Sequence, residues 1–548
     1  MKKKRILYLF TVGFIASCNS INPAAENSIR INSLGYTPDG IKKATLFDSS
    51  DQFKVFDAQT HKMVFKGTAT GPYYQKDVEQ QALIADFSKL TRAGNYYLKS
   101  KNGACSQQFT IGEQVYDSAY YTAMRGFYLW RCGTGVFGVH RNDTFTQNAC
   151  HLTDGWLNYT EFGHNHKDGT GGWHDAGDYG KYTVNSGITL GLLFFAWNNF
   201  ESKLKPRSLD IPNTAQEYPD FLKELKWEAD WLLKMEYPDF SGRISHKLSR
   251  LNFSAFIMPD QDVEKRYFSS WGTTATAHFA AVMAQAARYF KPYDPDYAQT
   301  CLNAALRAYK CLKHYPDYIK WQQDEFSTGG YQTPDTAARI WASAELWETT
   351  GEEQYLSDFE NQISKIGLNV DMNWDWQNVK NLGVYTYLLS AKEGKSPIIY
   401  QGLSQSLTNT ADSVAWWSDH DIYGRPFDKY YWGCNGTVAR LASNLYVAYA
   451  ISRNQKYKQV NDNIIAHLFG RNFYGRSFVT GLGFNPPMYP HDRRSGADSV
   501  LVPWPGYLVG GGHSATDWID EETSYSHNEI AINWQASLVF ALAFTLPH

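Results

Sequence analysis

The chain has 548 residues, with 52 Lys and Arg against 55 Asp and Glu, a formal net charge of −3. This near-neutral balance argues against a nucleic-acid binder, which needs basic residues clustered over its footprint. With 43 % hydrophobic and 20 % charged residues the chain is neither disordered nor membrane-embedded, and at roughly 150 residues per domain it holds two or more domains. Aromatic residues reach 16 %, which indicates a large aromatic core, a cleft with stacking surfaces, or both.

The N-terminus is typical of a secretory signal. Residues 2–5 are all basic and the apolar run 6–15 is too short to span a bilayer. The sequence that ends in Ala16-Ser17-Cys18 resembles a bacterial lipobox, which implies removal of residues 1–17, lipid on Cys18 and a tether over residues 18–28. Ordinary cleavage with an incidental Cys18 is the alternative. We expect a bacterial cell-envelope protein, held to the membrane through its N-terminal lipid only.

Residues 29–112 have a strand-like pattern in which turn-forming residues separate short apolar or alternating runs. Seven strands in this length predict a small immunoglobulin-like β-sandwich, although the Cys…Trp…Cys trio of antibody domains is missing. The expected strands are 29–31, 44–47, 53–56, 63–65, 82–87, 96–98 and 108–111.

From residue 113 to residue 548 the pattern is helical. Apolar residues recur at spacings near 3.6 in 221–233 and in further stretches, with almost no strand pattern between them. We therefore expect a mainly α domain, an α/α toroid whose long loops form a cleft at one end; periodicity alone also allows an irregular helical bundle. The further expected helices are 274–290, 298–313, 336–350, 379–392, 437–452, 457–468 and 528–544.

Two acidic segments are candidates for chemistry. The Gly-rich segment 171–182 holds Asp175 and Asp178 between aromatic residues, and such a pair could hold and deprotonate one water molecule. The same pair could also be a cation loop or a tight turn. Glu529 begins the apolar stretch near the C-terminus, where a helix N-terminus favours an acid, and by itself it is best explained as a helix-start residue.

Together these segments resemble glycoside hydrolase family 9, the cellulase family with inverting endoglucanases. Residues 29–36 look like the start of the immunoglobulin-like module that precedes many of its catalytic domains, and residues 477–485 with 490–493 match the family's histidine signature. Gln535 replaces the usual Asn of the C-terminal signature. The resemblance implies an (α/α)6 barrel after the sandwich. The C-terminal signature matches at Trp518, Asp520, Tyr525, Glu529 and Ala531.

The resemblance also implies the acid–base roles. Inverting hydrolysis needs a protonated acid for the leaving oxygen and a carboxylate that activates water on the opposite face of the sugar, about 6.5–9.5 Å apart. Glu529 matches the general acid, whose pKa should be raised. Asp178 matches the general base, and Asp175 would share and orient the water.

Further site residues follow from the same resemblance. His491 and Arg493 are expected to hydrogen-bond sugar hydroxyls at the cleavage point, and Asp520 to support the region of Glu529. Trp432 aligns with a stacking residue of the family and is expected to form a sugar platform. Tyr525, part of the C-terminal signature, is also expected to contact substrate.

Cys132, Cys150, His151 and His174 offer two thiols and two imidazoles, the ligand set of a closed structural zinc site. Their spacing alone is a weak signal, but family members with the immunoglobulin-like module carry a zinc site of this composition, and these positions match it. A Cys132–Cys150 disulfide with unrelated histidines is the alternative.

Calcium binding is doubtful. Many relatives have an acidic pair just before the helix that here contains Trp341 and Glu345, and Ala337-Ala338 takes the place of that pair. Calcium needs oxygen ligands, so we expect this site to be absent or remodelled, with Asp335 as a partial substitute.

We therefore expect an inverting endo-β-1,4-glucanase that hydrolyses cellulose fragments, mixed-linkage glucan or xyloglucan. We expect it to be a monomer whose partners are these glucans and not nucleic acid. An exo-acting β-glucosidase or cellobiohydrolase of the same family is the first alternative. A surface glycan-binding lipoprotein without activity is the second, and the intact Asp175, Asp178 and Glu529 argue against it. A catalytic zinc site is disfavoured because four protein ligands leave no open position.

Overall fold

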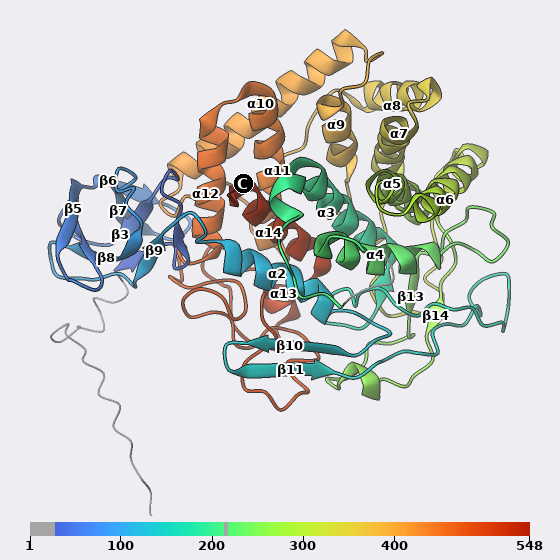
Figure 1. Ribbon diagram of the computed structural model, residues 1–548, viewed down its shortest axis with the longest axis horizontal. Helices are drawn as coiled ribbons and strands as arrows, with labels where there is room; N and C mark the ends of the chain where they lie inside the picture. The colour runs from blue at the N-terminus through green and yellow to red at the C-terminus, as the bar shows by residue number, and fades with distance from the viewer. Residues whose placement is uncertain (1–27, 213–216, 548) are drawn as a thin grey trace, which may run out of the picture.

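The computed structural model describes residues 28–212 and 217–547, in which a β-sandwich stands beside a larger helical barrel (Figure 1). The predicted signal peptide, Cys18 and the tether up to residue 27 lie outside the described residues. None of the helices in the described part combines the length and the apolar character needed to cross a membrane.

The sandwich has two sheets, of strand order β1-β3-β7-β6 and β2-β9-β8-β4-β5. Alternate residues such as Phe53, Val55, Tyr96 and Leu98 point between the sheets and form the core. The strands are β1 (Ile29–Arg30), β2 (Gly35–Tyr36), β3 (Lys43–Leu46), β4 (Gln52–Asp57), β5 (Met63–Thr68), β6 (Thr70–Gln75), β7 (Gln80–Asp86), β8 (Gly94–Ser100) and β9 (Phe109–Ile111).

The prediction of a sandwich is confirmed, but the sandwich has nine strands where the sequence predicted seven. β2 has only two residues, and β6 has no fully buried residue, so neither strand gives the alternating apolar pattern of a half-buried strand.

Six helices form the inner wall of the barrel. Each packs against the next, and the last closes on the first. They are α3 (Thr183–Leu204), α5 (Thr273–Phe290), α7 (Thr336–Thr350), α9 (Lys380–Leu389), α11 (Cys434–Ser452) and α14 (Ile532–Thr545).

Six further helices cover this wall from outside, which confirms the (α/α)6 barrel. They are α2 (Asp117–Leu129), α4 (Asp220–Leu233), α6 (Pro295–His314), α8 (Glu353–Ile366), α10 (Pro397–His420) and α12 (Gln455–Leu468). The sequence explains the two layers: in α14 every residue except Trp534 is buried, as expected of a helix surrounded by others, whereas α8 buries only Tyr355, Leu356, Phe359 and Ile363 on one face.

Two expectations for this domain are wrong. The apolar stretch 528–544 is not one helix, because the short α13 (Tyr525–Asn528) ends before Glu529 and α14 begins only at Ile532. The near absence of strands is also wrong. Short strands form a hairpin, β10 (Val136–His140) with β11 (Asp143–Gln147), and a small sheet of β12 (Lys181–Tyr182), β13 (Lys247–Ser249) and β14 (Tyr267–Phe268), and a 3-10 turn spans Pro259–Gln261.

The sandwich is bonded to the end of α12 and the segment after it. The Ser33 amide donates to the Phe469 carbonyl at 3.0 Å, and the Ile41 amide donates to the Asp462 carboxylate at 3.1 Å. The buried Arg471 donates to the Thr45 hydroxyl at 3.2 Å. These contacts fix the sandwich against the barrel wall.

Candidate active site

The segment 171–182 runs across the mouth of the barrel and is held by close backbone contacts. Gly177 lies so near the segment after α12 that a Cβ atom there would sit 2.0 Å from the His491 carbonyl oxygen. Its own carbonyl accepts from the Arg493 backbone amide at 3.2 Å and from Nη1 of Arg493 at 2.7 Å. Only glycine allows this approach, so the position is fixed by packing between two loops.

Asp175 and Asp178 are both buried, and hydroxyl or amide groups bind their oxygens. Asp178 Oδ2 accepts from the Gly180 amide at 3.0 Å and from the Tyr182 hydroxyl at 2.9 Å. Asp175 Oδ1 accepts from Nδ2 of Asn185 at 2.8 Å, on α3. Its Oδ2 accepts from the hydroxyl of Tyr331 at 2.6 Å.

Burial and the nearby Asp178 charge raise the pKa of Asp175 well above its usual range, while the hydrogen bonds from Tyr331 and Asn185 oppose this shift. The site therefore favours the protonated form of Asp175. The side chains of Asp175 and Asp178 are both buried, 2 % and 6 % exposed, rather than on an exposed surface turn.

Glu529 lies on the extended segment between α13 and α14. Isolated β-bridges pair this segment with both neighbouring loops, through His491 with Glu529 and Ala176 with Ala531. The Ile532 amide donates to the Asp175 carbonyl at 2.9 Å. The prediction that Glu529 begins a helix is thus corrected. The bridges hold residues 529–531 extended beside residues 171–180, which carry Asp175 and Asp178 and are called the aspartate loop below.

The charge environment of Glu529 favours its protonated form. Burial, followed by the negative charges of Asp178 and Asp175, raises the pKa of Glu529 well above its usual range. The Arg493 charge and a hydrogen bond with Trp432 act in the opposite direction and are outweighed.

All three carboxylates line one open pocket of about 560 Å³. Its walls are rich in aromatic rings, and Asp375 and Asn533 add polar groups. The aromatic lining residues are Tyr182, Phe253, Tyr331, Trp376, Trp432 and Trp534.

The other predicted substrate contacts gather at one side of this pocket. Trp432 and Tyr525 are 45 % and 54 % exposed, and their ring centroids lie 5.4 Å apart. The His491 ring is 6.1 Å from that of Tyr525, and its Nδ1 lies 2.7 Å from the Glu522 carbonyl oxygen, so this nitrogen donates and Nε2 is left for another partner. The structure thus brings Trp432, Tyr525 and His491 together beside Glu529.

Arg493 and Asp520 lie behind the pocket surface. Nε of Arg493 donates to the Ser254 carbonyl at 2.9 Å, in addition to its bond with Gly177. Asp520 accepts from Nδ2 of Asn528, the residue before Glu529, at 2.9 Å, and from the Met488 amide at 2.9 Å. Both residues therefore hold backbone segments of the site in place.

Sequence reasoning missed the residues that hold the aspartates. Tyr182 ends the same Gly-rich segment, and Tyr331 follows the Gly329-Gly330 pair of a loop between two of the predicted helices. Asn185 is a polar residue near the start of the largely apolar α3. A buried polar residue needs a partner, and this is the sequence signal that could have identified it.

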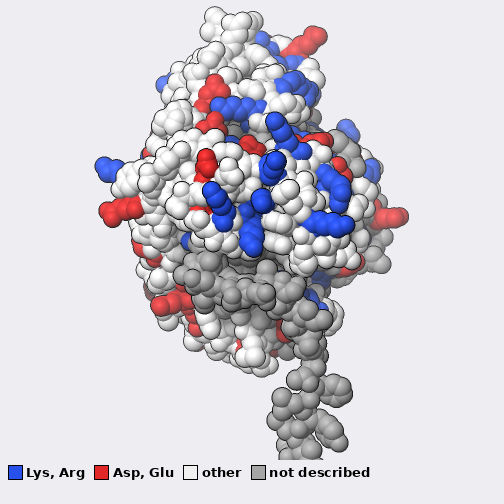
Figure 2. Space-filling model, turned by 90° about the vertical axis from the view of Figure 1, so that its left-hand side faces the viewer, with Lys and Arg blue, Asp and Glu red and all other residues white. Residues whose placement is uncertain are grey.

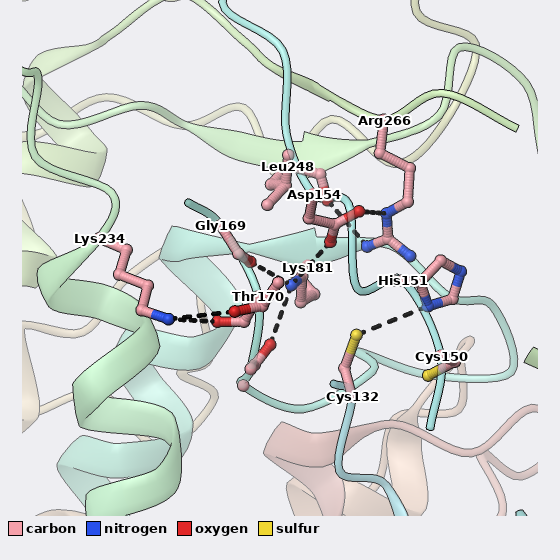
Figure 3. A network of polar contacts seen from close by, with 12 residues as sticks. Cys132, Cys150, His151, Asp154, Gly169, Thr170, Lys181, Lys234, Leu248 and Arg266 are labelled. Carbon is pink, nitrogen blue, oxygen red and sulfur yellow. Dashed lines mark hydrogen bonds and ion pairs between the residues drawn. The ribbon is translucent and has the colours of Figure 1, made fainter. Parts of the chain in front are cut away.

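The four predicted metal ligands come together in a buried cluster, part of which is shown in Figure 3. Their candidate ligand atoms all lie within 4.8 Å of one another, with Sγ of Cys132 3.5 Å from Nδ1 of His151 and Sγ of Cys150 3.8 Å from Nε2 of His174. Both cysteines are free thiols, contrary to the disulfide alternative. Two thiols and two imidazoles at these distances fit a four-ligand metal site.

Charged residues surround the cluster. Nε2 of His151 lies 3.5 Å from Oδ2 of Asp262, the kind of second partner that orients a metal-binding imidazole. Asp154 pairs with Lys181 at 3.0 Å and with Arg266 at 3.2 Å, both almost fully buried (Figure 3). The Asp154 amide also donates to the His151 carbonyl at 3.2 Å, so this network joins the cluster to β12, which directly follows the aspartate loop.

At the doubtful calcium position, Asp335 precedes α7 and accepts from Nε of Arg339 at 2.7 Å. The same guanidinium donates to the Leu312 and Tyr315 carbonyls at 2.9 and 2.7 Å. A positive side chain thus engages the one carboxylate that was expected to compensate for Ala337-Ala338.

Comparisons with known proteins confirm the predicted family. The Glycosyl hydrolase family 9 model matches residues 116–542, and the Cellulase N-terminal ig-like domain model matches residues 24–104. Endoglucanase D from Acetivibrio thermocellus is 49 % identical over 521 residues, covering 94 % of this chain and 83 % of that protein. A xyloglucan-specific endo-beta-1,4-glucanase from Bacteroides ovatus is 30 % identical over 594 residues, covering 100 % and 98 %. A solved Zn-binding triple mutant of the family 9 endoglucanase J30 has a TM-score of 0.88 at 29 % identity, covering 93 % and 99 %. The chain belongs to glycosyl hydrolase family 9 and is a glycoside hydrolase with an N-terminal immunoglobulin-like domain.

Proposed function

We propose that this enzyme is an inverting endo-β-1,4-glucanase. The observation that carries the proposal is the convergence of Asp175, Asp178 and Glu529, from two loops about 350 residues apart in sequence, on one open pocket lined with aromatic rings. The names of the relatives, an endoglucanase D and a xyloglucan-specific endo-beta-1,4-glucanase, support β-glucan as the substrate and internal cleavage as the mode.

In the proposed reaction Asp178 is the base and Glu529 the acid. Water attacks the anomeric carbon and gives its proton to Asp178, while Glu529 protonates the leaving glycosidic oxygen and the bond to it breaks. Attack on the face opposite the leaving group converts the β-linkage to an α-configured end. The raised pKa of Glu529 suits a residue that must keep its proton until this step.

The remaining residues would position substrate and loops. Trp432 and Tyr525 offer exposed ring surface for a sugar, and Nε2 of His491 can bind a hydroxyl. Asp175, held by Tyr331 and Asn185, would orient the water. For Arg493 the hydrogen bonds support a role in fixing Gly177, and its expected contact with a sugar hydroxyl stays a prediction.

The test is hydrolysis of barley mixed-linkage glucan, xyloglucan and soluble cellulose by the protein without residues 1–18. Rapid loss of viscosity with α-configured new ends is expected, and Glu529→Gln should lower the rate by about 10²–10⁴ because it removes the general acid. Glu521→Gln, an exposed neighbour in the same segment, is the matched control and should keep full activity.

Other outcomes point to the alternatives. Release of only glucose or cellobiose, without loss of viscosity, would contradict internal cleavage and favour an exo-acting enzyme. Retained glucan binding without turnover by the wild-type protein would favour a non-catalytic glycan-binding protein.

We propose a structural zinc ion held by Cys132, Cys150, His151 and His174. The donor set and its geometry support this, as does the existence of a Zn-binding triple mutant of a similar family 9 endoglucanase. When bound, the ion would cross-link the segments that precede and contain the aspartate loop, because His174 is joined directly to Asp175.

We also propose that the mature chain is anchored in the bacterial cell envelope by lipid on Cys18. The lipobox-like sequence and the basic, then apolar N-terminus support this. Labelling of the full-length chain with a radioactive fatty acid in a bacterial host, lost in Cys18→Ala, is the expected result; retained label would contradict the assignment.

A further inference from the structure

The two domains carry opposite charge. Residues 29–112 hold 11 Lys and Arg against 7 Asp and Glu, a net charge of +4, whereas residues 113–548 hold 37 against 47, a net charge of −10. The near-neutral total thus conceals a basic sandwich joined to an acidic barrel. Figure 2 shows Lys and Arg gathered on the sandwich end of the molecule.

Four of these basic residues line one hollow on the outer face of the five-stranded sheet. We call Lys54, Lys66, Lys99 and Lys101 the basic hollow; it encloses about 620 Å³, and all four side chains are exposed. The other lining residues are Gln52, Phe53, Phe56, Gly67, Thr68 and Ser100, so none is acidic.

The strand register places three of these lysines side by side. Lys54 on β4 lies directly opposite Lys66 on β5 and Lys99 on β8. Like charges at directly opposed positions destabilise a sheet. Within residues 28–212 and 217–547 no ion pair involves any of the four, so the repulsion is not relieved inside the protein.

An anionic partner would relieve this repulsion. The position of the sandwich next to the proposed lipid anchor favours a membrane surface as that partner. Ten residues lie between Cys18 and Ile29, the first residue of β1, so lipid on Cys18 would hold the sandwich within about 40 Å of the bilayer. The sandwich can therefore reach the surface, and within about 10 Å of it basic side chains are attracted to anionic headgroups, whereas an acidic barrel would be repelled.

We propose that the basic hollow binds the phosphate groups of anionic lipid headgroups and turns the sandwich toward the membrane and the barrel away from it. The biological setting rests on the proposed lipid anchor, but the binding itself does not. Each lysine close to an anionic surface adds roughly fivefold to the partition coefficient.

The experiment uses the protein without residues 1–28, which has no lipid, and measures co-sedimentation with vesicles. Binding is expected to phosphatidylcholine vesicles that contain phosphatidylglycerol, not to phosphatidylcholine alone, and should weaken as salt is added. The triple variant K54E/K66E/K99E should lose at least roughly a hundredfold in partition, while hydrolysis of soluble glucan stays unchanged.

The control variant K291E/K310E/K365E makes the same change in net charge on exposed barrel lysines and should bind as the wild type does. Equal loss in both triple variants, or no binding of the wild type to the anionic vesicles, would overturn the proposal. So would capture by an acidic polysaccharide such as polygalacturonate without vesicle binding, which would assign the hollow to an acidic glycan. Failure here leaves glucan hydrolysis and fatty-acid labelling of Cys18 as independent measurements.

Discussion

Tyr331→Phe tests whether the hydroxyl that binds Asp175 sets the pH range of the enzyme. The hydrogen bond is short, 2.6 Å, and lies in a buried site. A hydrogen bond to a charged group contributes about 1.5–3 kcal/mol, and one pKa unit corresponds to about 1.4 kcal/mol. Because the bond favours the ionised carboxylate, its loss should raise the pKa of Asp175 by about 1–2 units.

The assay is the pH dependence of kcat/KM on a soluble β-glucan oligosaccharide. The acid limb should move to higher pH by that amount, so that kcat/KM below the limb falls about ten- to a hundredfold. Tyr309→Phe is the control, because the Tyr309 hydroxyl also binds a carboxylate, that of Asp358 at 2.7 Å, but in the outer wall. An unmoved acid limb in Tyr331→Phe, or an equal shift in Tyr309→Phe, would refute the reasoning.

Three further predictions concern the support of the site. Cys132→Ser should lose bound zinc in elemental analysis and lower the Tm, whereas the buried Cys311→Ser should keep the metal; equal metal content in both would contradict the zinc site. Burial raises the pKa of Glu228 to about 7, so between pH ~4.5 and ~7 the folded state binds a proton that the unfolded state does not, and stability falls by roughly 3 kcal/mol as pH rises. In Glu228→Gln the fall in the free energy of unfolding across that pH range, measured with urea, should be smaller by about this amount, and an unchanged fall would contradict the raised pKa of Glu228. Arg339→Ala leaves the buried Asp335 without its partner and should lower the free energy of unfolding by roughly 3 kcal/mol in urea; a change near zero would show the pair to be dispensable.

The regular parts of the fold could be predicted from local pattern. The predicted helix 336–350 coincides with α7, because its apolar residues have a helical period and Gly351, with a φ of 76°, ends it. The stretch 528–544 has an equally apolar sequence, yet its first residues are extended. The backbone of these residues is hydrogen-bonded to neighbouring loops; for example, the Gly510 amide donates to the Glu529 carbonyl at 2.8 Å. Such contacts between distant segments cannot be predicted from a local sequence pattern.

The same limit applies to the site. Asp175, Asp178 and Glu529 were predicted as candidates because they are acids in unusual local sequence and match a family pattern. Tyr331 and Asn185 were not predicted, because their importance comes only from touching Asp175 across the fold. The residues that do chemistry thus leave a stronger sequence signal than those that hold them.

The arrangement of three buried carboxylates requires residues that hold them in place. Burial and the repulsion from the two aspartates raise the pKa of Glu529 only while the groups cannot move apart or admit water. The aspartate loop is fixed on two sides near its start: the His174 amide donates to the Trp130 carbonyl at 2.9 Å, and the Trp173 amide donates to the buried Glu228 at 2.6 Å. A metal ion on the thiols and imidazoles would add a third restraint at His174. The buried contacts behind the aspartate loop therefore keep the two aspartates close to Glu529, and the raised pKa of this proposed acid depends on that closeness.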